Sequence, residues 1–305
     1  MKLLLEPKLE KVFLPDAYEY RPNKSAHQAI AITRTRCWES NWVLEFDIKG
    51  LFDNIPWELL QRAVRKHVDS KWILLYIKRW LKAPLQLADG ALKERVKGTP
   101  QGGCVSPTLN NLFMHYCFDY WIAREYPYHS WCRYADDGLI HCKTEMQANY
   151  ILDKLRKRFT ECGIELHEGK TKIIYCRDQL RRETTTNYEF DFLGFNFRTR
   201  VARNSKDGRM FKTFSPAPSP KALKEIRRVI KYRWRLQSWI HYSLEDIAKM
   251  INPVIQGWIN YYAKFNKSHF APIAKYLNDL WYFFNIPYYC PLLLDLKESL
   301  KPRPE

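Results

Sequence analysis

Acidic residues at the ends of apolar segments constrain this chain more than any other feature of its sequence. Asp47 closes an apolar segment, residues 42–48, that predicts a short buried strand. Asp136 and Asp137 occupy the tight turn of a second segment, residues 130–142, that predicts a hairpin. Carboxylates beside buried strands are unfavourable unless a positive charge neutralises them. We therefore expect a sheet that brings these three carboxylates together around a cation.

Magnesium suits such a cluster best. Mg²⁺ prefers one or two carboxylates together with the phosphate oxygens of a substrate. Two ions roughly 3.5–4 Å apart can serve the attacking and the leaving oxygen of a displacement reaction. An Asp-Asp-Gly sequence by itself can be an ordinary turn, because Asp is a common turn former. The pairing with Asp47, a glycine-rich loop at residues 98–104 and the basic composition favour the cation site.

The charge balance of the chain points to a polyanionic partner. The 305 residues include 50 Lys and Arg against 33 Asp and Glu, a formal net charge of +17. Such a surplus is typical of proteins that bind nucleic acid, and a merely basic soluble surface is the alternative. The eight cysteines form no C-x-x-C pair, which excludes zinc-ribbon spacing. Without a signal peptide or a run of 18 apolar residues, we expect a cytoplasmic, nucleic-acid-associated protein with no membrane partner.

A series of motifs in order along the chain resembles the reverse transcriptases encoded by group II introns, the maturases. Residues 46–56 (FDIKGLFDNIP) resemble their first catalytic block, and residues 134–137 (YADD) match the polymerase signature. Further matches are residues 20–27, 98–107, 163–173 and 192–195, and residues 251–262 in the thumb, which is also called the maturase or X domain. The resemblance extends over most of the chain.

This resemblance implies a catalytic centre that holds two Mg²⁺ ions. Asp47 and Asp136 would ligate both ions, assisted by the backbone carbonyl of Ile48, and Asp137 would be the third catalytic carboxylate. Lys170 matches the lysine that would protonate the leaving pyrophosphate. Outside this context Lys170 would be an ordinary solvated lysine.

The resemblance also implies residues that bind the incoming nucleotide. Phe52 stands where the family has an aromatic steric gate against the 2′-hydroxyl, although core packing is the alternative. Gln101 would contact the nucleotide, and Gly102 would let the backbone approach it, although the loop could also be a simple tight turn. Arg21 and Lys24 are candidates to hold phosphates or the template backbone.

The expected fold is α+β: a polymerase palm with an antiparallel sheet and helices on one face, partial fingers and an all-helical thumb. We place the partial fingers at residues 1–40, the palm with fingers elements at 41–197 and the helical thumb at 198–305, with a proline-rich linker at 215–220. Relative to the family, we expect a chain that is truncated at the N-terminus and lacks the C-terminal endonuclease.

Local signals predict several helices and their starts. We expect helices over residues 57–81 and 146–162, and helices that begin at Ser106, Ser219 and Ser243 as N-caps. In the thumb, a cluster of cations is interleaved with apolar and aromatic residues and predicts nucleic-acid binding. This basic cluster consists of Arg227, Arg228, Lys231, Arg233 and Arg235, whereas Ile226, Ile230 and Trp234 are expected to pack inward.

The function expected from the resemblance is RNA-directed DNA polymerisation of the group II intron type. The partners would be an RNA template, a DNA primer, dNTPs and intron RNA, whose binding would support splicing and mobility. Two alternatives stay open: a non-polymerising RNA-binding splicing cofactor and an inactive truncated fragment. The three acids favour the polymerase, because a pure binder has no need of them, whereas the missing outer fingers count against it.

Overall fold

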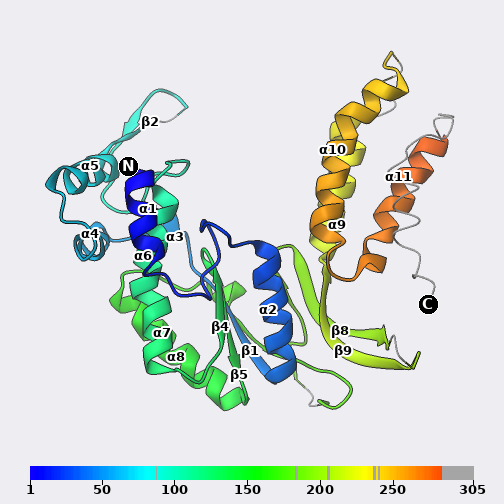
Figure 1. Cartoon of the computed structure of the whole chain (residues 1–305), viewed down its shortest axis with the longest axis horizontal. Helices are drawn as coiled ribbons and strands as arrows, with labels where there is room; N and C mark the ends of the chain where they lie inside the picture. The colour runs from blue at the N-terminus through cyan, green and yellow to red at the C-terminus, as the bar shows by residue number, and fades with distance from the viewer. Residues whose placement is uncertain (87, 183–184, 205–206, 236–237, 240, 284–305) are drawn as a thin grey trace. The chain divides into compact units, whose positions relative to one another are not determined.

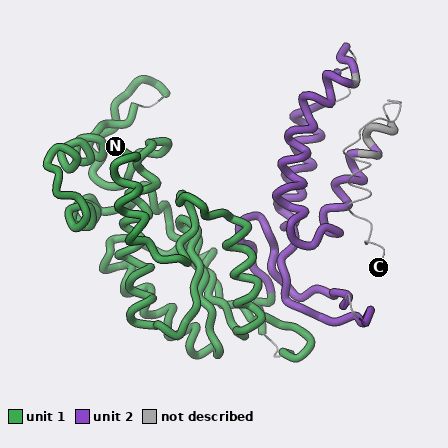
Figure 2. Tube along the Cα trace, viewed as in Figure 1, with its two compact units in different colours: residues 1–188 green, residues 189–305 purple. Residues whose placement is uncertain are grey.

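The chain is arranged as two compact units. The computed structural model describes residues 1–283 apart from residues 87, 183–184, 205–206, 236–237 and 240. Residues 1–188 form the first unit and residues 189–305 the second (Figures 1 and 2). The division comes earlier than residue 198, where the sequence predicts it. Cys290 and the rest of the C-terminal segment lie outside the described residues.

A four-stranded antiparallel sheet organises the first unit (Figure 1). In the spatial order β4-β5-β1-β6, its strands are β4 (Trp131–Tyr134), β5 (Asp137–Cys142), β1 (Trp42–Asp47) and β6 (Lys172–Tyr175). The strand predicted at residues 42–48 and the hairpin predicted at 130–142 are therefore confirmed. Both segments are rich in aliphatic and aromatic side chains, which suit strands that are buried on both faces.

Short helices surround this sheet. In chain order they are α1 (Lys2–Glu10), α2 (Ala26–Glu39), α3 (Leu51–Asn54), α4 (Trp57–Arg65), α5 (Lys71–Lys82), α6 (Ser106–Met114), a π-helical turn (His115–Asp119), α7 (Tyr120–Glu125) and α8 (Glu145–Glu161). A small hairpin follows α5 and consists of β2 (Leu85–Gln86) and β3 (Leu92–Lys93). The single helix predicted over residues 57–81 is thus wrong, because the chain turns between α4 and α5. The helix predicted over residues 146–162 is confirmed, and Gly163 follows it with a φ of +71°, typical of a glycine that ends a helix.

Helices cover both faces of the sheet, whereas the sequence analysis predicted helices on one face. On one face, the ring of Phe46 in β1 meets that of Phe159 in α8, with centroids 5.7 Å apart. On the other face, helix α2 packs against β4 and β5, and the buried Thr33 of α2 lies near the thiol of Cys132 in β4. Successive side chains of a strand point to opposite faces. Because most side chains of both sets are buried here, each face is covered by a helix.

The second unit begins with a sheet and continues with helices. Its strands are β7 (Phe190–Phe192), β8 (Phe195–Arg203) and β9 (Met210–Pro218), and its helical segments are α9 (Pro220–Arg228), a π-helical turn (Val229–Trp234), α10 (Leu244–Tyr262) and α11 (Ala271–Phe283). The prediction that residues 198–305 are all helical, with a linker at 215–220, is therefore wrong at its start. Pro216 and Pro218 pair with β8 from the outer strand β9, where a residue without a backbone N–H is tolerated.

Two of the three predicted serine N-caps are confirmed. The hydroxyl oxygens of Ser219 and Ser243 each accept a hydrogen bond from the backbone N–H three residues further on, at 3.1 and 3.2 Å. Ser106 is not an N-cap: α6 is preceded by Val105, and the Ser106 hydroxyl donates to the carbonyl of Pro100 at 2.6 Å. Of the helices that the structure describes, none has the length and apolar content to cross a membrane.

Acid is expected to destabilise the first unit through His141 in β5. Burial lowers the pKa of this imidazole to about 3, against 6.5 in the unfolded chain. Below pH 6.5 the imidazole therefore binds a proton in the unfolded state but stays neutral in the folded state, and the free energy of unfolding falls. Between pH 7.5 and pH 5 we expect His141 to remove about 2 kcal/mol from the free energy of unfolding. Urea titrations of His141→Leu should show a flatter pH dependence, whereas the exposed His241→Leu should leave it unchanged.

Candidate active site

Strand pairing brings the three predicted carboxylates to one corner of the sheet. Asp47, the last residue of β1, lies directly opposite Asp137, the first residue of β5. Partners of this kind have Cα atoms roughly 4.5–5.5 Å apart. Asp136 precedes Asp137 in the two-residue turn between β4 and β5, where Ala135 has a positive φ of 54°. This carboxylate corner is what the sequence predicted.

The negative charges of the carboxylate corner are only partly compensated. Burial, and then the charges of Asp136 and Asp47, raise the pKa of Asp137 to about 7. The pKa of Asp136 is also raised, mainly by burial. Asp47 is 7% exposed, and its Oδ2 lies 3.0 Å from Nζ of Lys170, an exposed lysine whose pKa this contact raises. One ammonium faces three carboxylates, so the corner favours a further cation.

The aromatic ring of Phe46 packs tightly against the backbone next to the carboxylate corner. Gly138 follows Asp137 and lies opposite Phe46, and a Cβ added at Gly138 would be 2.0 Å from the Phe46 ring. That ring also packs edge-on against Phe118, with centroids 4.9 Å apart. Glycine is therefore required after the two acids, because no other residue leaves room for this packing.

Arg133 anchors the turn that carries Asp136, and the sequence analysis missed it. Its side chain is 1% exposed and forms an ion pair with the fully buried Asp119, with N–O distances of 2.6 and 2.7 Å. Nη1 of Arg133 also donates to the carbonyl of Ala135 and to Oδ1 of Asn111, both at 3.2 Å. The guanidinium thus ties the turn to the helices behind it. The available signal was a charged residue inside an apolar strand, which is rarely buried without a partner.

The segment after α8 brings Lys170 to the carboxylate corner. The backbone N–H of His167 donates to the carbonyl of Asp47 at 2.8 Å, and the carbonyl of His167 accepts from the N–H of Lys170 at 3.0 Å. A 3₁₀ turn, Glu168–Lys170, forms between them. His167 therefore contributes through its backbone: it couples the end of β1 to the lysine that faces Asp47.

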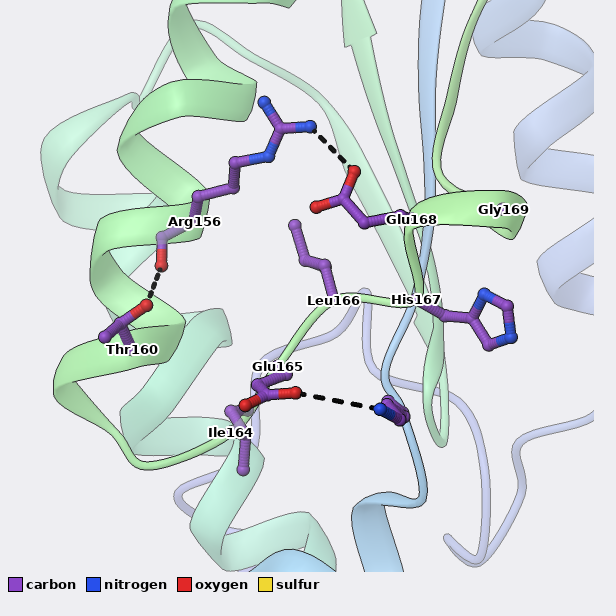
Figure 3. A pocket seen from close by; sticks show the side chains of 9 residues that line it. Arg156, Thr160, Ile164, Glu165, Leu166, His167, Glu168 and Gly169 are labelled. Atoms are coloured by element: carbon purple, nitrogen blue, oxygen red, sulfur yellow. Dashed lines mark hydrogen bonds and ion pairs between the residues drawn. The ribbon is translucent and has the colours of Figure 1, made fainter.

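An open pocket of about 580 Å³ lies between this segment and α8 (Figure 3). Ion pairs border it: Arg156 lies 3.1 Å from Glu168, and Lys49 lies 4.0 Å from Glu165. Figure 3 shows Leu166 pointing into the space between Arg156 and Glu165, while His167 points away from it. Because both signs of charge alternate around the rim, the pocket has no preference for an anion or a cation.

The glycine-rich loop packs against the turn that follows β1. The backbone N–H groups of Gly98 and Thr99 donate to the carbonyls of Ile55 and Phe52, at 2.8 and 2.6 Å. Gly98 has a φ of +79°, and a Cβ there would lie 2.7 Å from the backbone of Asp53. Only glycine allows this approach, which fixes the loop beside the end of β1.

This contact groups the predicted nucleotide-binding residues around α3. Phe52 in α3 is half-buried against the core. Nε2 of Gln101 donates to Oδ2 of Asp53 at 3.2 Å, and Gly102 has a φ of +79° with open space around it. Their contacts with a nucleotide stay predictions.

Arg21 does not have the role that the sequence suggested. Its side chain is 5% exposed, and Nε and Nη2 lie 3.0 and 2.6 Å from Glu10 Oε1. The other donors reach the carbonyls of Phe13, Leu14 and Ala17. These bonds use all five N–H donors of a guanidinium. In this conformation Arg21 braces the chain after α1 and has no donor left for a phosphate.

Lys24 is less constrained. Its Nζ donates to the carbonyl of Pro15 at 2.7 Å and lies 4.9 Å from the centre of the Tyr18 ring. An ammonium has three donors, so one carbonyl does not exhaust it. A phosphate contact by Lys24 stays a prediction.

The basic cluster of the second unit has the predicted orientation. Ile226, Ile230 and Trp234 are buried in the core of that unit, where they pack with residues of α10 and α11. The five cationic side chains, Arg227, Arg228, Lys231, Arg233 and Arg235, are all exposed. The inward packing is thus confirmed, and the binding of nucleic acid stays a prediction.

The chemistry of the carboxylate corner fits a hard divalent cation. Its donors are carboxylate oxygens, the ligands that such a cation prefers. The backbone N–H of His167 donates to the carbonyl of Asp47, and that of Lys49 donates to the carbonyl of Glu165. Neither bond uses the carbonyl oxygen of Ile48. Among the described residues, no group of three or more His, Cys, Asp and Glu side chains is arranged to hold a metal ion in this conformation. Lys170 lies against Asp47 instead, so ion binding would require the ammonium to move aside.

The chain is similar to several proteins, two of which are named for an intron. Protein YkfC of Escherichia coli is 26% identical over 275 residues, which cover 78% of this chain and 68% of the relative. The uncharacterized 91 kDa protein in the cob intron of Schizosaccharomyces pombe is 23% identical and covers 91% of this chain. The group II intron-encoded protein LtrA of Lactococcus lactis is 32% identical over 115 residues, 38% of this chain. The chain spans 41% of the second relative and 19% of the third.

The fold and the family of the chain come from two separate comparisons. The telomerase of Candida albicans, solved in complex with a TWJ fragment of telomeric RNA, shares the fold with a TM-score of 0.51 at 15% identity, over 97% of this chain and 49% of the telomerase. Residues 223–281 match the maturase-specific domain of group II introns. Residues 1–197, which include the carboxylate corner and the glycine-rich loop, match the reverse transcriptase (RNA-dependent DNA polymerase) family. The chain therefore belongs to the reverse transcriptase family and carries a group II intron maturase-specific domain beside its polymerase domain.

Proposed function

We propose that this chain is an RNA-directed DNA polymerase that adds a nucleotide from a dNTP to the 3′-hydroxyl of a primer on an RNA template. The observation that carries the proposal is the pairing of Asp47 with Asp137, with Asp136 in the adjoining turn. The primer oxygen would attack the α-phosphate, and pyrophosphate would leave. Two Mg²⁺ ions would be held by Asp47 and Asp136 with the carbonyl of Ile48, and Asp137 would be the third carboxylate.

The protein's own groups would complete this site. Bound Mg²⁺ would supply charge stabilisation at the reacting phosphate. A lysine is protonated at neutral pH, so Nζ of Lys170 would give a proton to the departing pyrophosphate once it has left Asp47, the contact that raises its pKa. Arg133 would hold the turn that carries Asp136 through its bond to the Ala135 carbonyl. Gln101 and Gly102 would receive the incoming nucleotide beside α3.

Phe52 is expected to select deoxyribonucleotides. Phe52→Val should leave dNTP incorporation largely intact and raise the use of ribonucleotides about tenfold or more, because steric exclusion of one small group is worth about 1–3 kcal/mol. Primer extension with each nucleotide type measures the ratio. Phe113→Val, which truncates a buried ring of the same core, serves as the control for general loosening. If the two variants discriminate equally well, Phe52 is only a packing residue.

A second candidate function is an RNA-binding splicing cofactor that does not polymerise. The match of residues 223–281 to the maturase-specific domain and the five exposed cations of the basic cluster favour it. Intron RNA would be the partner in that case, and both functions could share one chain.

Three measurements on one preparation separate these functions from an inactive fragment. dNTP incorporation on a primed RNA template with Mg²⁺ tests polymerisation, and a splicing assay with a group II intron RNA tests the cofactor. A thermal melt of the same preparation shows whether the chain is folded. Incorporation supports the polymerase. A folded chain that promotes splicing without incorporation supports the cofactor, and a folded chain that does neither contradicts both.

A further inference from the structure

Helix α5 presents an exposed aromatic face that the carboxylate corner does not use. Trp72, Tyr76 and Trp80 follow one another at every fourth position and are 52%, 43% and 40% exposed. The side made by Ile73, Ile77 and Leu81, about 100° around the helix axis from these rings, is buried in the core. Large aromatic side chains gathered in an exposed row mark a binding surface. We refer to Trp72, Tyr76 and Trp80 as the aromatic ladder.

The three rings form a continuous row along the helix. The ring centroids of Trp72 and Tyr76 are 6.2 Å apart, and those of Tyr76 and Trp80 are 6.0 Å apart. The guanidinium of Arg79 lies over the Tyr76 ring, 5.8 Å from its centroid. Arg79 thus shows a planar cation packed against one ring of the ladder, while neighbouring rings meet each other at interplanar angles of 81° and 48°.

Every charged residue of α5 is positive. The helix contains Lys71, Lys78, Arg79 and Lys82 and no Asp or Glu. Lys71 and Lys78, together with Arg65 of α4, also line a groove of about 270 Å³ between α4 and α5, and its lining includes no carboxylate. With 3.6 residues per turn, the three lysines lie on a flank about 140° around the axis from the ladder, and Arg79 lies between the two.

We propose that this face of α5 binds single-stranded RNA, with bases stacked on the aromatic ladder and phosphates held by the cations of the helix. Charge decides between the possible occupants, since a polyanion complements a helix with no negative residue, whereas a neutral apolar protein segment does not. Aromatic rings beside cations are the combination that binds single strands without sequence preference. We assign RNA because the family copies RNA. The surface contains no residue of the carboxylate corner, so it does not depend on the proposed polymerase chemistry.

Leucine substitutions test the ladder, because they keep apolar area and remove the ring faces. In the full chain, Trp72→Leu, Tyr76→Leu and Trp80→Leu together should weaken binding of a fluorescently labelled oligo(U) RNA at least about tenfold, since each stacked base is worth about fivefold or more. Binding of a duplex RNA should change little. Tyr128→Leu, at a ring that is 98% exposed outside α5, is the matched control. Circular dichroism and a thermal melt verify folding, and Tyr76→Leu alone serves if the triple variant is unstable.

The charges are tested separately. Lys71→Gln with Lys78→Gln should reduce the slope of log affinity against log salt by about 1.4, roughly 0.7 for each phosphate of a single strand that a lysine no longer neutralises. Unchanged oligo(U) affinity in the leucine variant overturns the proposal, and so does a loss confined to oligo(dT). If the wild-type chain self-associates and the ring-free variant dissociates but keeps its RNA affinity, the face is a protein interface and the proposal is also overturned. Binding is measured without dNTPs, so failure of polymerisation does not affect this outcome.

Discussion

Replacing Asp136 by alanine is expected to reduce primer extension on an RNA template by at least about a thousandfold, because charge stabilisation by metal ions is worth several kcal/mol and each 1.36 kcal/mol is about a factor of ten. The residue is in the turn between β4 and β5 and only half-buried, so its removal leaves the core intact. It also relieves repulsion, since Asp136 is a cause of the raised pKa of Asp137. Steady-state and single-turnover extension with Mg²⁺ measure the loss.

Binding of RNA distinguishes a loss of polymerase activity from a loss of folding. The Asp136→Ala chain should bind the primed RNA template as the unmodified chain does and should melt at the same or a higher temperature. Asp153→Ala is the control, because it removes an exposed carboxylate of α8 with a similar change in net charge. Extension by the Asp136→Ala chain at a rate close to that of the control would contradict the assignment of the carboxylate corner.

Breaking the buried pair of Arg133 and Asp119 is expected to have the largest effect on stability. Both side chains are almost completely inaccessible, and Asp119→Ala leaves the guanidinium buried without its carboxylate. Loss of one partner from such a pair costs about 3–5 kcal/mol. Because domains are stable by only about 5–15 kcal/mol in total, this loss should unfold a large part of the population at moderate urea concentrations. Urea titration by fluorescence measures it.

A double substitution separates stability from positioning. Arg133→Met with Asp119→Leu removes both charges and should recover most of the stability, since apolar replacements of a buried pair are often neutral. The Ala135 carbonyl then loses its donor, so primer extension should stay reduced although the chain is folded. Glu125→Ala, which opens the exposed pair with Arg124, should change the free energy of unfolding by less than about 1 kcal/mol. A fully active double variant would show that Arg133 does not position the turn.

In the outer strand β9, a local proline pattern predicts a linker where the structure has a strand. Pro216 and Pro218 predict a linker, because proline cannot donate to a central ladder. In the structure they pair with β8 from an outer strand, where that donor is not needed. Whether a strand is central or outer depends on its neighbours in space. Sequence spacing does not contain this information.

Local patterns by themselves determined three features of this protein: the strand that ends at Asp47, the hairpin that presents Asp136 and Asp137, and the inward side of the helical segment with Ile226 and Ile230. Strand alternation, tight turns and helical periodicity act over a few residues, so a single sequence is sufficient to predict them. Only the tertiary structure decided what the buried arginines do. Arg21 lies inside one family motif and Arg133 directly precedes another, yet Arg21 braces a loop and Arg133 holds the turn that carries Asp136. The role of a guanidinium depends on which carboxylates and carbonyls lie within hydrogen-bond distance of it. Those partners belong to segments that are separate in the chain, so only the folded structure shows them.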